Sequence, residues 1–175
     1  MFERMSVASV KIPEGVKVEV TGGHVVVSFN NLLKKIKFNE KLLSVSSDGG
    51  MVRLALKGKE RRKSVAVLNS IKAHLLKTFK GFKEPFVKTL EVVYAHFPVS
   101  VEVKKDEVLI KNFLGEKIPR VAKITPGVEV KVEGQKIIVK GFDKDGVGQT
   151  ASNIVRSVKI KNKDIRVFQD GVYYV

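Results

Sequence analysis

The sequence predicts an α+β fold in two duplicated domains, each built from small, largely antiparallel sheets with one packed helix. A pattern of alternating β-branched residues occurs twice, as IPEGVKVEVTGGHVVV at 12–27 and as ITPGVEVKVEGQKIIV at 124–139. An amphipathic helical pattern follows the strand patterns in each half of the chain. The two halves also correspond in order at a constant shift of 83 residues, which places Val16 opposite Val99. One hairpin cannot bury its apolar face alone, so a chain that repeats it is built by repetition.

The first half begins with three predicted strands and a second hairpin. In the hairpin at 12–27, valines alternate with charged residues, which is typical of a half-buried strand. Residues 32–38, LLKKIKF, are expected to form a third strand. Leu42–Ser46 and Met51–Leu56 predict the second hairpin, joined by the turn Ser47-Asp48-Gly49-Gly50, whose glycines allow a positive φ.

A helix is predicted from Glu60 to Lys80, because the spacing of apolar residues changes from two to three and four. Gly81 is expected to be the C′ residue that ends it. The apolar face is formed by Val65, Leu68, Ile71, Leu75 and Phe79, and the opposite face carries Arg61, Arg62, Lys63, Lys72, Lys77 and Lys80.

The second half gives the same elements in the same order. Val99–Val103 and Val108–Ile110 predict a hairpin, Ile118–Ile124 predicts a strand, and Val128–Lys140 predicts the second hairpin. A helix is expected to follow, with Asp143 capping its first turn. Its apolar face is formed by Val147, Ala151, Ile154 and Val158.

We therefore divide the chain into a first domain, 1–82, and a second domain, 83–175. At the shift of 83 residues, the hairpin at 12–27 corresponds to residues 95–110. Its closer copy at 124–139 is then a similar hairpin at a different place in the fold.

The net charge is the strongest compositional clue to function. Thirty-three Lys and Arg against eighteen Asp and Glu leave +15, with a pI near 10.0. Both domains are basic, with +10 in residues 1–82 and +5 in residues 83–175. A folded protein this basic is typical of proteins that bind a polyanion, and nucleic acid is the leading candidate.

Several other classes are disfavoured. The sequence contains no cysteine, which excludes disulfides and thiolate metal sites. Neither the N-terminal stretch, MFERMSVASVKI, nor any other has the apolar run of an export signal or a membrane span. We therefore expect a soluble cytoplasmic protein without a membrane partner.

The inventory of catalytic groups is poor. His24, His74 and His96 lack the spacing of metal ligands. In the segment 141–150, GFDKDGVGQT, two glycines are separated by four residues, as in a phosphate-binding loop, but Val147 stands where that motif has its lysine. We expect no enzyme activity, no metal, no cofactor and no small-molecule substrate.

Three groups of basic residues are candidates for contact with phosphates, although lysines also commonly cover surface without a partner. They are KGKERRK at 57–63, then Lys34, Lys35 and Lys37, and finally Lys159, Lys161, Lys163 and Arg166.

The last segment, 159–175, combines the third basic group with aromatic residues. Arg can bridge phosphates or lie on a base, and a Tyr or Phe ring can stack on one, which suits structured RNA. The alternative is that Phe168 and Tyr173 are core anchors of a terminal strand.

Three motifs resemble a known family. RVFQDGVYY at 166–174, VGQTASNI at 147–154 and NFLGEKIPR at 112–120 are similar to ribosomal protein six of the large subunit, in its archaeal and eukaryotic form. The resemblance covers essentially the whole chain, and the first half matches mainly by the order of elements and by IPEGVKVEV. In the family the terminal motif is usually followed by a basic residue, so we do not expect that contact here.

The resemblance implies two similar domains from a duplication, each with small sheets and one helix around a single core. It also implies a structural, non-catalytic role on the ribosome, with large-subunit rRNA bound mainly by the second domain near the base of the factor-binding stalk and the sarcin-ricin loop. Neighbouring ribosomal proteins are the other partners expected. The candidate rRNA-binding residues, from the motifs and the basic tail, are Asn112, Gly115, Lys117, Arg120, Gln149, Lys159, Lys161, Lys163, Arg166, Gln169 and Tyr173.

The first hypothesis is therefore a structural component of the large ribosomal subunit that holds RNA by phosphate and shape contacts. The alternative is a free-standing architectural protein that binds RNA or DNA. A third hypothesis, a phosphate-processing enzyme that uses segment 141–150, requires nucleotide binding.

Overall fold

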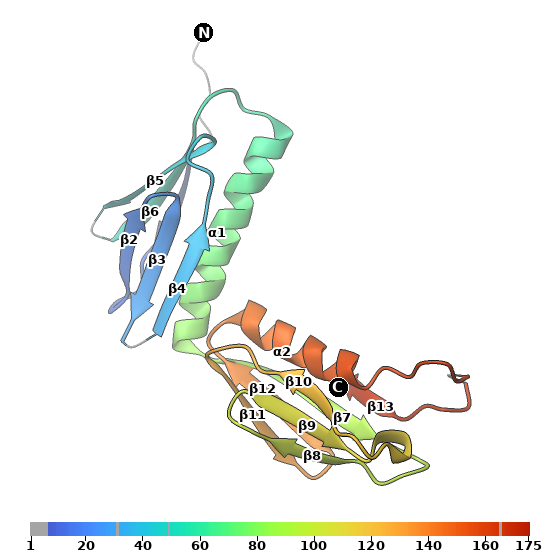
Figure 1. The fold of residues 1–175 in the computed structure, drawn as a ribbon. Helices are drawn as coiled ribbons and strands as arrows, with labels where there is room; N and C mark the ends of the chain where they lie inside the picture. The colour runs from blue at the N-terminus through green and yellow to red at the C-terminus, as the bar shows by residue number, and fades with distance from the viewer. Residues whose placement is uncertain (1–6, 31, 49, 165) are drawn as a thin grey trace. The chain divides into compact units, whose positions relative to one another are not determined.

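The chain forms two compact units that divide between Lys83 and Glu84. The structure is a computed structural model and describes residues 7–30, 32–48, 50–164 and 166–175. Each unit combines small antiparallel sheets with one long helix, which confirms the predicted α+β class (Figure 1). The boundary expected from the sequence, after Phe82, lies one residue before this division.

The first unit contains two three-stranded antiparallel sheets. One has the strand order β1-β6-β5 and the other has the order β2-β3-β4. The predicted hairpins at 12–27 and 42–56 and the strand at 32–38 are confirmed. The strands are β1 (Val7–Lys11), β2 (Lys17–Thr21), β3 (His24–Phe29), β4 (Leu32–Lys37), β5 (Leu43–Asp48) and β6 (Met51–Leu56).

The first helix extends further than its sequence pattern predicted. Helix α1 (Arg62–Lys83) buries the predicted apolar face, apart from the half-buried Val65 at its start. Gly81 lies inside the helix and is buried, so the prediction that it ends the helix is wrong. The physical reason is packing: the extra turn carries Phe82, whose ring stacks on Phe29 with the centroids 5.5 Å apart.

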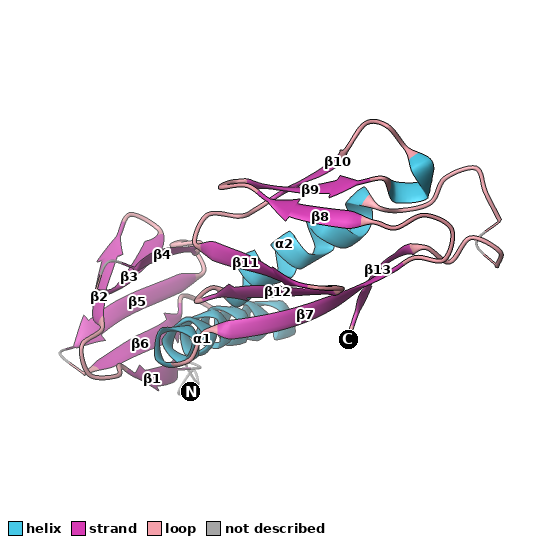
Figure 2. Ribbon diagram, turned by 90° about the horizontal axis from the view of Figure 1, so that it is seen from below, coloured by secondary structure: helices cyan, strands magenta, loops and turns pink. Residues whose placement is uncertain are grey.

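The second unit repeats this plan and adds a strand. One sheet has the order β10-β9-β8, and the other has the order β11-β12-β7-β13. Figure 2 shows these sheets as two separate layers, and α2 contacts strands of both. The elements are β7 (Phe86–Val93), β8 (Ser100–Val103), β9 (Glu107–Lys111), the 3-10 turn η1 (Phe113–Gly115), β10 (Arg120–Lys123), β11 (Val128–Glu133), β12 (Lys136–Gly141), α2 (Lys144–Ser157) and β13 (Gly171–Tyr174).

Strand order decides which hairpins correspond. Hairpin β2-β3 is continued by β4, and hairpin β8-β9 is continued by β10 in the same way. Hairpin β11-β12 instead pairs with β7, as β5-β6 pairs with β1. The copy at 124–139 is therefore a similar hairpin at a different place, and the counterpart of 12–27 is the hairpin within 95–110, as expected.

The start of α2 has the predicted cap. The Asp143 side chain accepts a hydrogen bond from the backbone N of Asp145 at 3.3 Å. Within the helix, the buried Thr150 hydroxyl accepts from the backbone N of Thr125 at 3.1 Å, which ties α2 to the segment before β11. Gly141 is required for packing, because a Cβ there would lie 3.0 Å from Val147 Cγ2.

Two elements were not predicted from the sequence: strand β1, which pairs with β6, and the 3-10 turn η1 in the NFLG segment. Strand β13, which pairs with β7, is the terminal strand that the sequence offered as an alternative for the last segment. The strand predicted at 118–124 is shorter, since β10 begins at Arg120. In the turn between β5 and β6, Gly50 does not have a positive φ, and Gly49 lies outside the described residues.

Each unit has its own hydrophobic core. In the first unit the core is formed by β-strand residues such as Val25, Val27 and Leu54 against the α1 face. In the second unit it is formed by residues such as Ile110 and Ile137 against α2. Independent cores allow the exposed segments of the second unit to be positioned without help from the first.

Candidate nucleic-acid interface

All eleven candidate residues lie in the second unit: on the connection from β9 to β10 and the first residue of β10, on α2, and on the C-terminal segment 159–175. The first segment is the connection from β9 to β10, residues 112–119. Asn112 has a left-handed φ of 59°, and its Nδ2 donates to the Pro98 carbonyl at 2.9 Å. Gly115 has a φ of 77°, and a Cβ there would meet the Phe97 ring at 3.3 Å. Both residues therefore shape this loop against residues 97–98.

Arg120 holds the same loop against the end of α2. Its Nε and one terminal nitrogen donate to both carboxylate oxygens of Glu116, at 2.8 and 2.6 Å. The other terminal nitrogen donates to the carbonyls of Ser157 and Lys159, each at 3.0 Å. The guanidinium also lies 4.5 Å from the centroid of the Phe113 ring. Most of its donors are thus used inside the protein, which fits a positioning role better than direct contact with RNA.

The Arg120–Glu116 ion pair should make the stability of the fold depend on pH in the acidic range. Hydrogen bonding from Arg120 lowers the pKa of Glu116 below its ordinary value of 4.5. The unfolded chain then binds more protons at low pH, so the pair stabilises the fold above pH 4.5 and loses this effect as the pH falls through the folded pKa. Because Glu116 is partly exposed, the contribution is small.

We therefore expect Glu116→Gln to show a smaller drop in Tm between pH 6 and pH 3 than the unchanged chain, over about the range where carboxylates titrate. Thermal unfolding followed by circular dichroism measures this. The control is Glu133→Gln, an exposed glutamate on β11. Equal acid sensitivity of Glu116→Gln and the unchanged chain would contradict the role of the pair.

Asp170 anchors the C-terminal segment 159–175, the tail, to the residues that follow β7. Asp170 is 2% exposed, and its Oδ1 accepts from the backbone N of Ala95 at 3.1 Å and lies 3.2 Å from His96 Nδ1. Its Oδ2 is buried without a hydrogen-bond partner among the described residues. The His96 ring stacks on Phe168, with the centroids 5.0 Å apart. His96 therefore has a structural role in the tail.

The tail presents its basic side chains to solvent. Lys161 and Lys163 are exposed, and the Lys163 ammonium lies 4.6 Å from the centroid of the Phe168 ring. Arg166 is 86% exposed and pairs with Asp164, whose pKa is lowered by the hydrogen bonds from Arg166. Phe168 is half-buried and lies outside β13, so it anchors the loop rather than a terminal strand.

Tyr173 links the end of the tail, on β13, back to Gln169. It projects from β13, is half-exposed, and its hydroxyl donates to the Gln169 carbonyl at 2.9 Å. Gln169 Nε2 donates in turn to the Arg166 carbonyl at 3.3 Å. Gly171 leaves room for the Tyr173 ring, since a Cβ there would lie 3.2 Å from it. The ring is neither a core anchor nor free, and Tyr173 is 49% exposed, as a ring that stacks on a base must be in part.

Gln149 is separated from the tail. It lies on the exposed side of α2, about 12 Å along the helix axis from Ser157 at the usual rise per residue. Its Nε2 donates to Asn153 Oδ1 at 2.8 Å, and Asn153 Nδ2 donates to the Lys123 carbonyl at 2.9 Å. The structure therefore groups the loop residues and the tail, while Gln149 extends the same side of α2.

A groove of about 430 Å³ lies between the last turn of α2 and β13. Its walls are mainly apolar, and Arg156 and Lys159 are exposed at its rim. Of the two acidic residues in the tail, Asp164 is paired and Asp170 is buried. The exposed charge of this surface is therefore positive, as phosphate binding requires.

Comparison with known proteins identifies the family. The model of the family described as ribosomal protein L6 matches residues 97–171. Large ribosomal subunit protein uL6 of Methanococcus vannielii is 40% identical over 168 residues, which are 95% of this chain and 91% of that protein. The chain belongs to the ribosomal protein L6 family. The resemblance seen in the three motifs is thereby confirmed.

Two residues of this L6 family member were missed by the sequence reasoning. Arg156 lies at the groove rim one turn before Lys159, and its basic character at the end of a helix was a usable signal. Asn153 links Gln149 to β10, and no local pattern predicts a bond to a carbonyl thirty residues away. The structure adds both to the candidate surface.

The described residues offer no site for a metal ion and no membrane-spanning helix. Among the described residues, no group of three or more His, Asp or Glu side chains could hold a metal ion. No helix in the described ranges is long and apolar enough to cross a membrane. Of the three glycines in segment 141–150, a Cβ at Gly148 would meet open space, whereas Gly141 faces Val147 and Val128, and Gly146 faces Val128 and Thr125. Packing explains Gly141 and Gly146 without a bound phosphate.

Proposed function

We propose that the chain is a structural, non-catalytic component of the large ribosomal subunit and that its second unit binds large-subunit rRNA near the base of the factor-binding stalk and the sarcin-ricin loop. Membership of the ribosomal protein L6 family supports the assignment to the ribosome, and hence to the cytoplasm. Neighbouring ribosomal proteins are its other partners.

The observation that carries the proposal is the surface around the end of α2. Five exposed basic side chains gather there within one loop and one helical turn, and only Arg166 is paired with a carboxylate in the described structure. These residues are Arg156, Lys159, Lys161, Lys163 and Arg166. The half-exposed Tyr173 ring lies on the strand beside them. Phosphate contacts with a stacking ring suit the wide minor groove and unpaired bases of folded RNA.

Within this surface the candidate residues have two roles. Lys117 and the basic residues of the tail have exposed side chains that can reach phosphates. Asn112, Gly115 and Arg120 hold the loop in shape, and Gln169 holds Tyr173. We propose that the second group acts on RNA indirectly.

Hydroxyl-radical footprinting of large-subunit rRNA with the full chain tests the site of binding. We expect protection at the stalk base and the sarcin-ricin helix, which weakens steeply between about 50 and 200 mM salt because counterions are released. A basic protein of unrelated fold and equal charge is the control. Protection confined to other helices, or the same diffuse protection by the control, would contradict the proposal.

A further inference from the structure

The first unit has an open sheet edge where the second unit has a fourth strand. In the described part of the first unit, β1 pairs with β6 alone, so it is an edge strand. In the second unit, β7 has the corresponding position and pairs with β12 on one side and with β13 on the other. The second unit therefore shows how an added strand can pair with the strand that corresponds to β1.

The path of the chain after each helix explains the difference. After α2 the chain turns back and returns as β13, beside β7. After α1 it continues directly into β7 of the second unit. Within the described part of the first unit, no strand that follows α1 pairs with the free edge of β1.

The two edges align residue by residue. The backbone N of Ile12 donates to Gly50, just before β6, at 2.9 Å. The backbone N of Val92 donates to Gln135, just before β12, at 2.8 Å. Ile12 therefore corresponds to Val92 in this alignment of the two sheets.

It follows that Ser9 corresponds to Thr89, and Lys11 to Glu91. In an antiparallel ladder, alternate residues direct both backbone groups to the same side. Because Ile12 faces β6, the N–H and C=O groups of Ser9 and Lys11 face the open edge, where both residues are exposed. In the second unit the Thr89 carbonyl accepts from the backbone N of Val175 at 3.3 Å. The β1 edge thus offers the same unused ladder.

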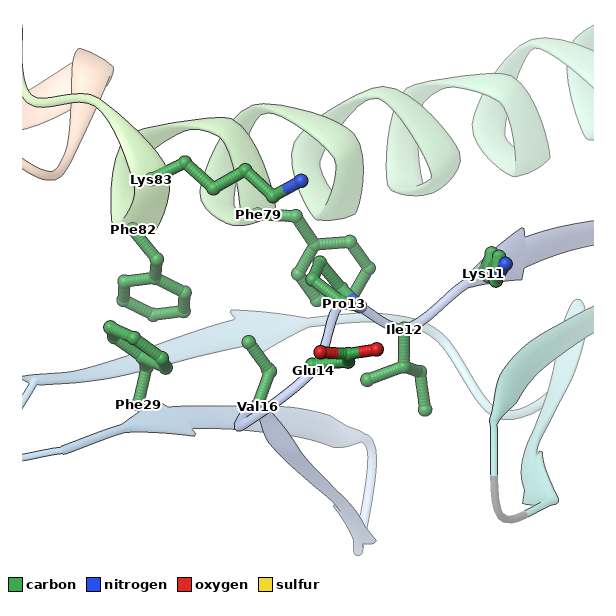
Figure 3. Close-up of a pocket in the computed structure, with 9 residues that line it drawn as sticks. All are labelled: Lys11, Ile12, Pro13, Glu14, Val16, Phe29, Phe79, Phe82 and Lys83. Carbon is green, nitrogen blue, oxygen red and sulfur yellow. The ribbon is translucent and has the colours of Figure 1, made fainter.

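A groove of about 730 Å³ adjoins the end of β1. Figure 3 shows the Phe29 and Phe82 rings facing each other at one end of it, with the Phe79 ring near Pro13. Lys11 and Lys83 also line it, together with Glu14. Its apolar walls are formed by Ile12, Pro13, Val16, Phe29, Phe79 and Phe82.

The repeat also indicates which side chain would enter this groove. In the second unit Val172 pairs with Val92 and is 3% exposed, packed in the core that includes α2. The same position on a strand added to β1 lies opposite Ile12, which lines the groove. An apolar side chain there would be buried between the sheet and α1.

We propose that the β1 edge and its groove form a docking site for an extended segment of another protein, which adds to the sheet as a strand antiparallel to β1. The alternating donors and acceptors of the edge match a polypeptide and not the repeat of a nucleic acid. Lys11 and Lys83 at the groove, in a unit that carries +10 over residues 1–82, favour acidic residues beside its apolar anchor. The site does not rest on RNA binding by the second unit.

Photo-crosslinking from the edge tests the proposal. Val7 is 60% exposed at the start of β1, and Val7→p-benzoylphenylalanine places a photoreactive group beside the open ladder. The full chain with this substitution is assembled into large ribosomal subunits and irradiated. We expect a cross-linked product that resists ribonuclease and is shortened by protease, with another ribosomal protein as the second component.

A proline pair makes the test specific. Ser9→Pro removes the outward N–H and fills its place with the ring, while the bonds from β1 to β6 remain. We expect it to lower the cross-link yield about tenfold, the effect of at least one lost hydrogen bond. Ser47→Pro, on β5 at the opposite edge of the same sheet, is the matched control. The Leu42 carbonyl accepts from the backbone N of Lys57, just after β6, so by alternation the backbone groups of Ser47 point away from β6. The cross-link yield with Ser47→Pro should stay unchanged.

Three outcomes would overturn the proposal: a product with RNA alone, a product with a second copy of this chain, or no product in assembled subunits. Equal yields with Ser9→Pro and Ser47→Pro would do the same. If Ser9→Pro lowers the Tm of the free chain, a lower cross-link yield could come from unfolding, and amide hydrogen exchange in the unsubstituted chain then serves as the test. The Ser9 and Lys11 amides should then exchange fast in the free chain and slowly in the subunit, and fast exchange in both would refute strand addition.

Discussion

Replacing Lys161, Lys163 and Arg166 together with alanine is expected to lower the affinity for large-subunit rRNA about tenfold to a hundredfold at physiological salt. The three side chains project from the loop between α2 and β13 and are exposed. Each phosphate contact contributes roughly one unit to the slope of log K against log salt, so this slope should fall by about 2 to 3. Filter binding over a salt series measures both quantities.

Stability separates this loss from unfolding. Lys161 and Lys163 are exposed, the Lys163 ammonium lies over the half-buried Phe168 ring, and the Arg166 side chain bonds only to Asp164 among described residues. The unfolding free energy should therefore change by less than about 0.5 kcal/mol per substitution. The matched control removes the same charge elsewhere in the second unit, by alanine at Lys131, Lys136 and Lys140. If both triple variants lose affinity equally, net charge and not this tail drives binding.

Arg120→Ala is expected to lower the unfolding free energy by about 2–3 kcal/mol, because several charge-assisted hydrogen bonds are lost together. The Ser157 and Lys159 carbonyls at the end of α2 lose their donor, and the Glu116 carboxylate loses its partner. Only 22% of the Arg120 side chain is exposed, so water replaces these bonds incompletely. Denaturant unfolding measures the effect.

Arg120→Lys decides whether the residue acts through shape or through charge. Lysine keeps the positive charge but has no planar fork, so it cannot bond to Glu116 and to both carbonyls at once. We expect Arg120→Lys to recover less than about half of the lost stability and to bind RNA as weakly as Arg120→Ala. Full recovery of RNA affinity with Arg120→Lys would show that Arg120 contacts phosphate directly.

Much of the fold could be predicted because its signals are local. Alternation in 12–27 and 124–139, and three-and-four spacing in both helices, each depend on residues within one element. The end of α1 could not be predicted in this way. Gly81 has the character of a helix stop, but packing of Phe82 on Phe29, more than fifty residues earlier, continues the helix past it.

The edge strands β1 and β13 illustrate the same limit. Both are short, and each exists because it pairs with a strand distant in sequence, β6 or β7. Alternation in a five-residue stretch does not identify its pairing partner, since register is set by the buried face of the whole sheet. Only the assembled sheets show that one unit has a fourth strand, whereas β1 in the described part of the other unit pairs on one side only.

The sequence by itself determined that the chain is basic, duplicated and similar in its terminal motifs to a ribosomal family. The sequence also indicated the candidate surface, because the basic residues and the motifs are each contained in a short stretch of the chain. Tertiary structure decided which of those residues face outward. In the sequence, Arg120 and Asp170 look like surface charges. The fold brings Arg120 against the end of α2 and buries Asp170 in contact with Ala95 and His96. The physical reason is that a side chain's role depends on which of its donors and acceptors are already satisfied, and distant residues supply those partners.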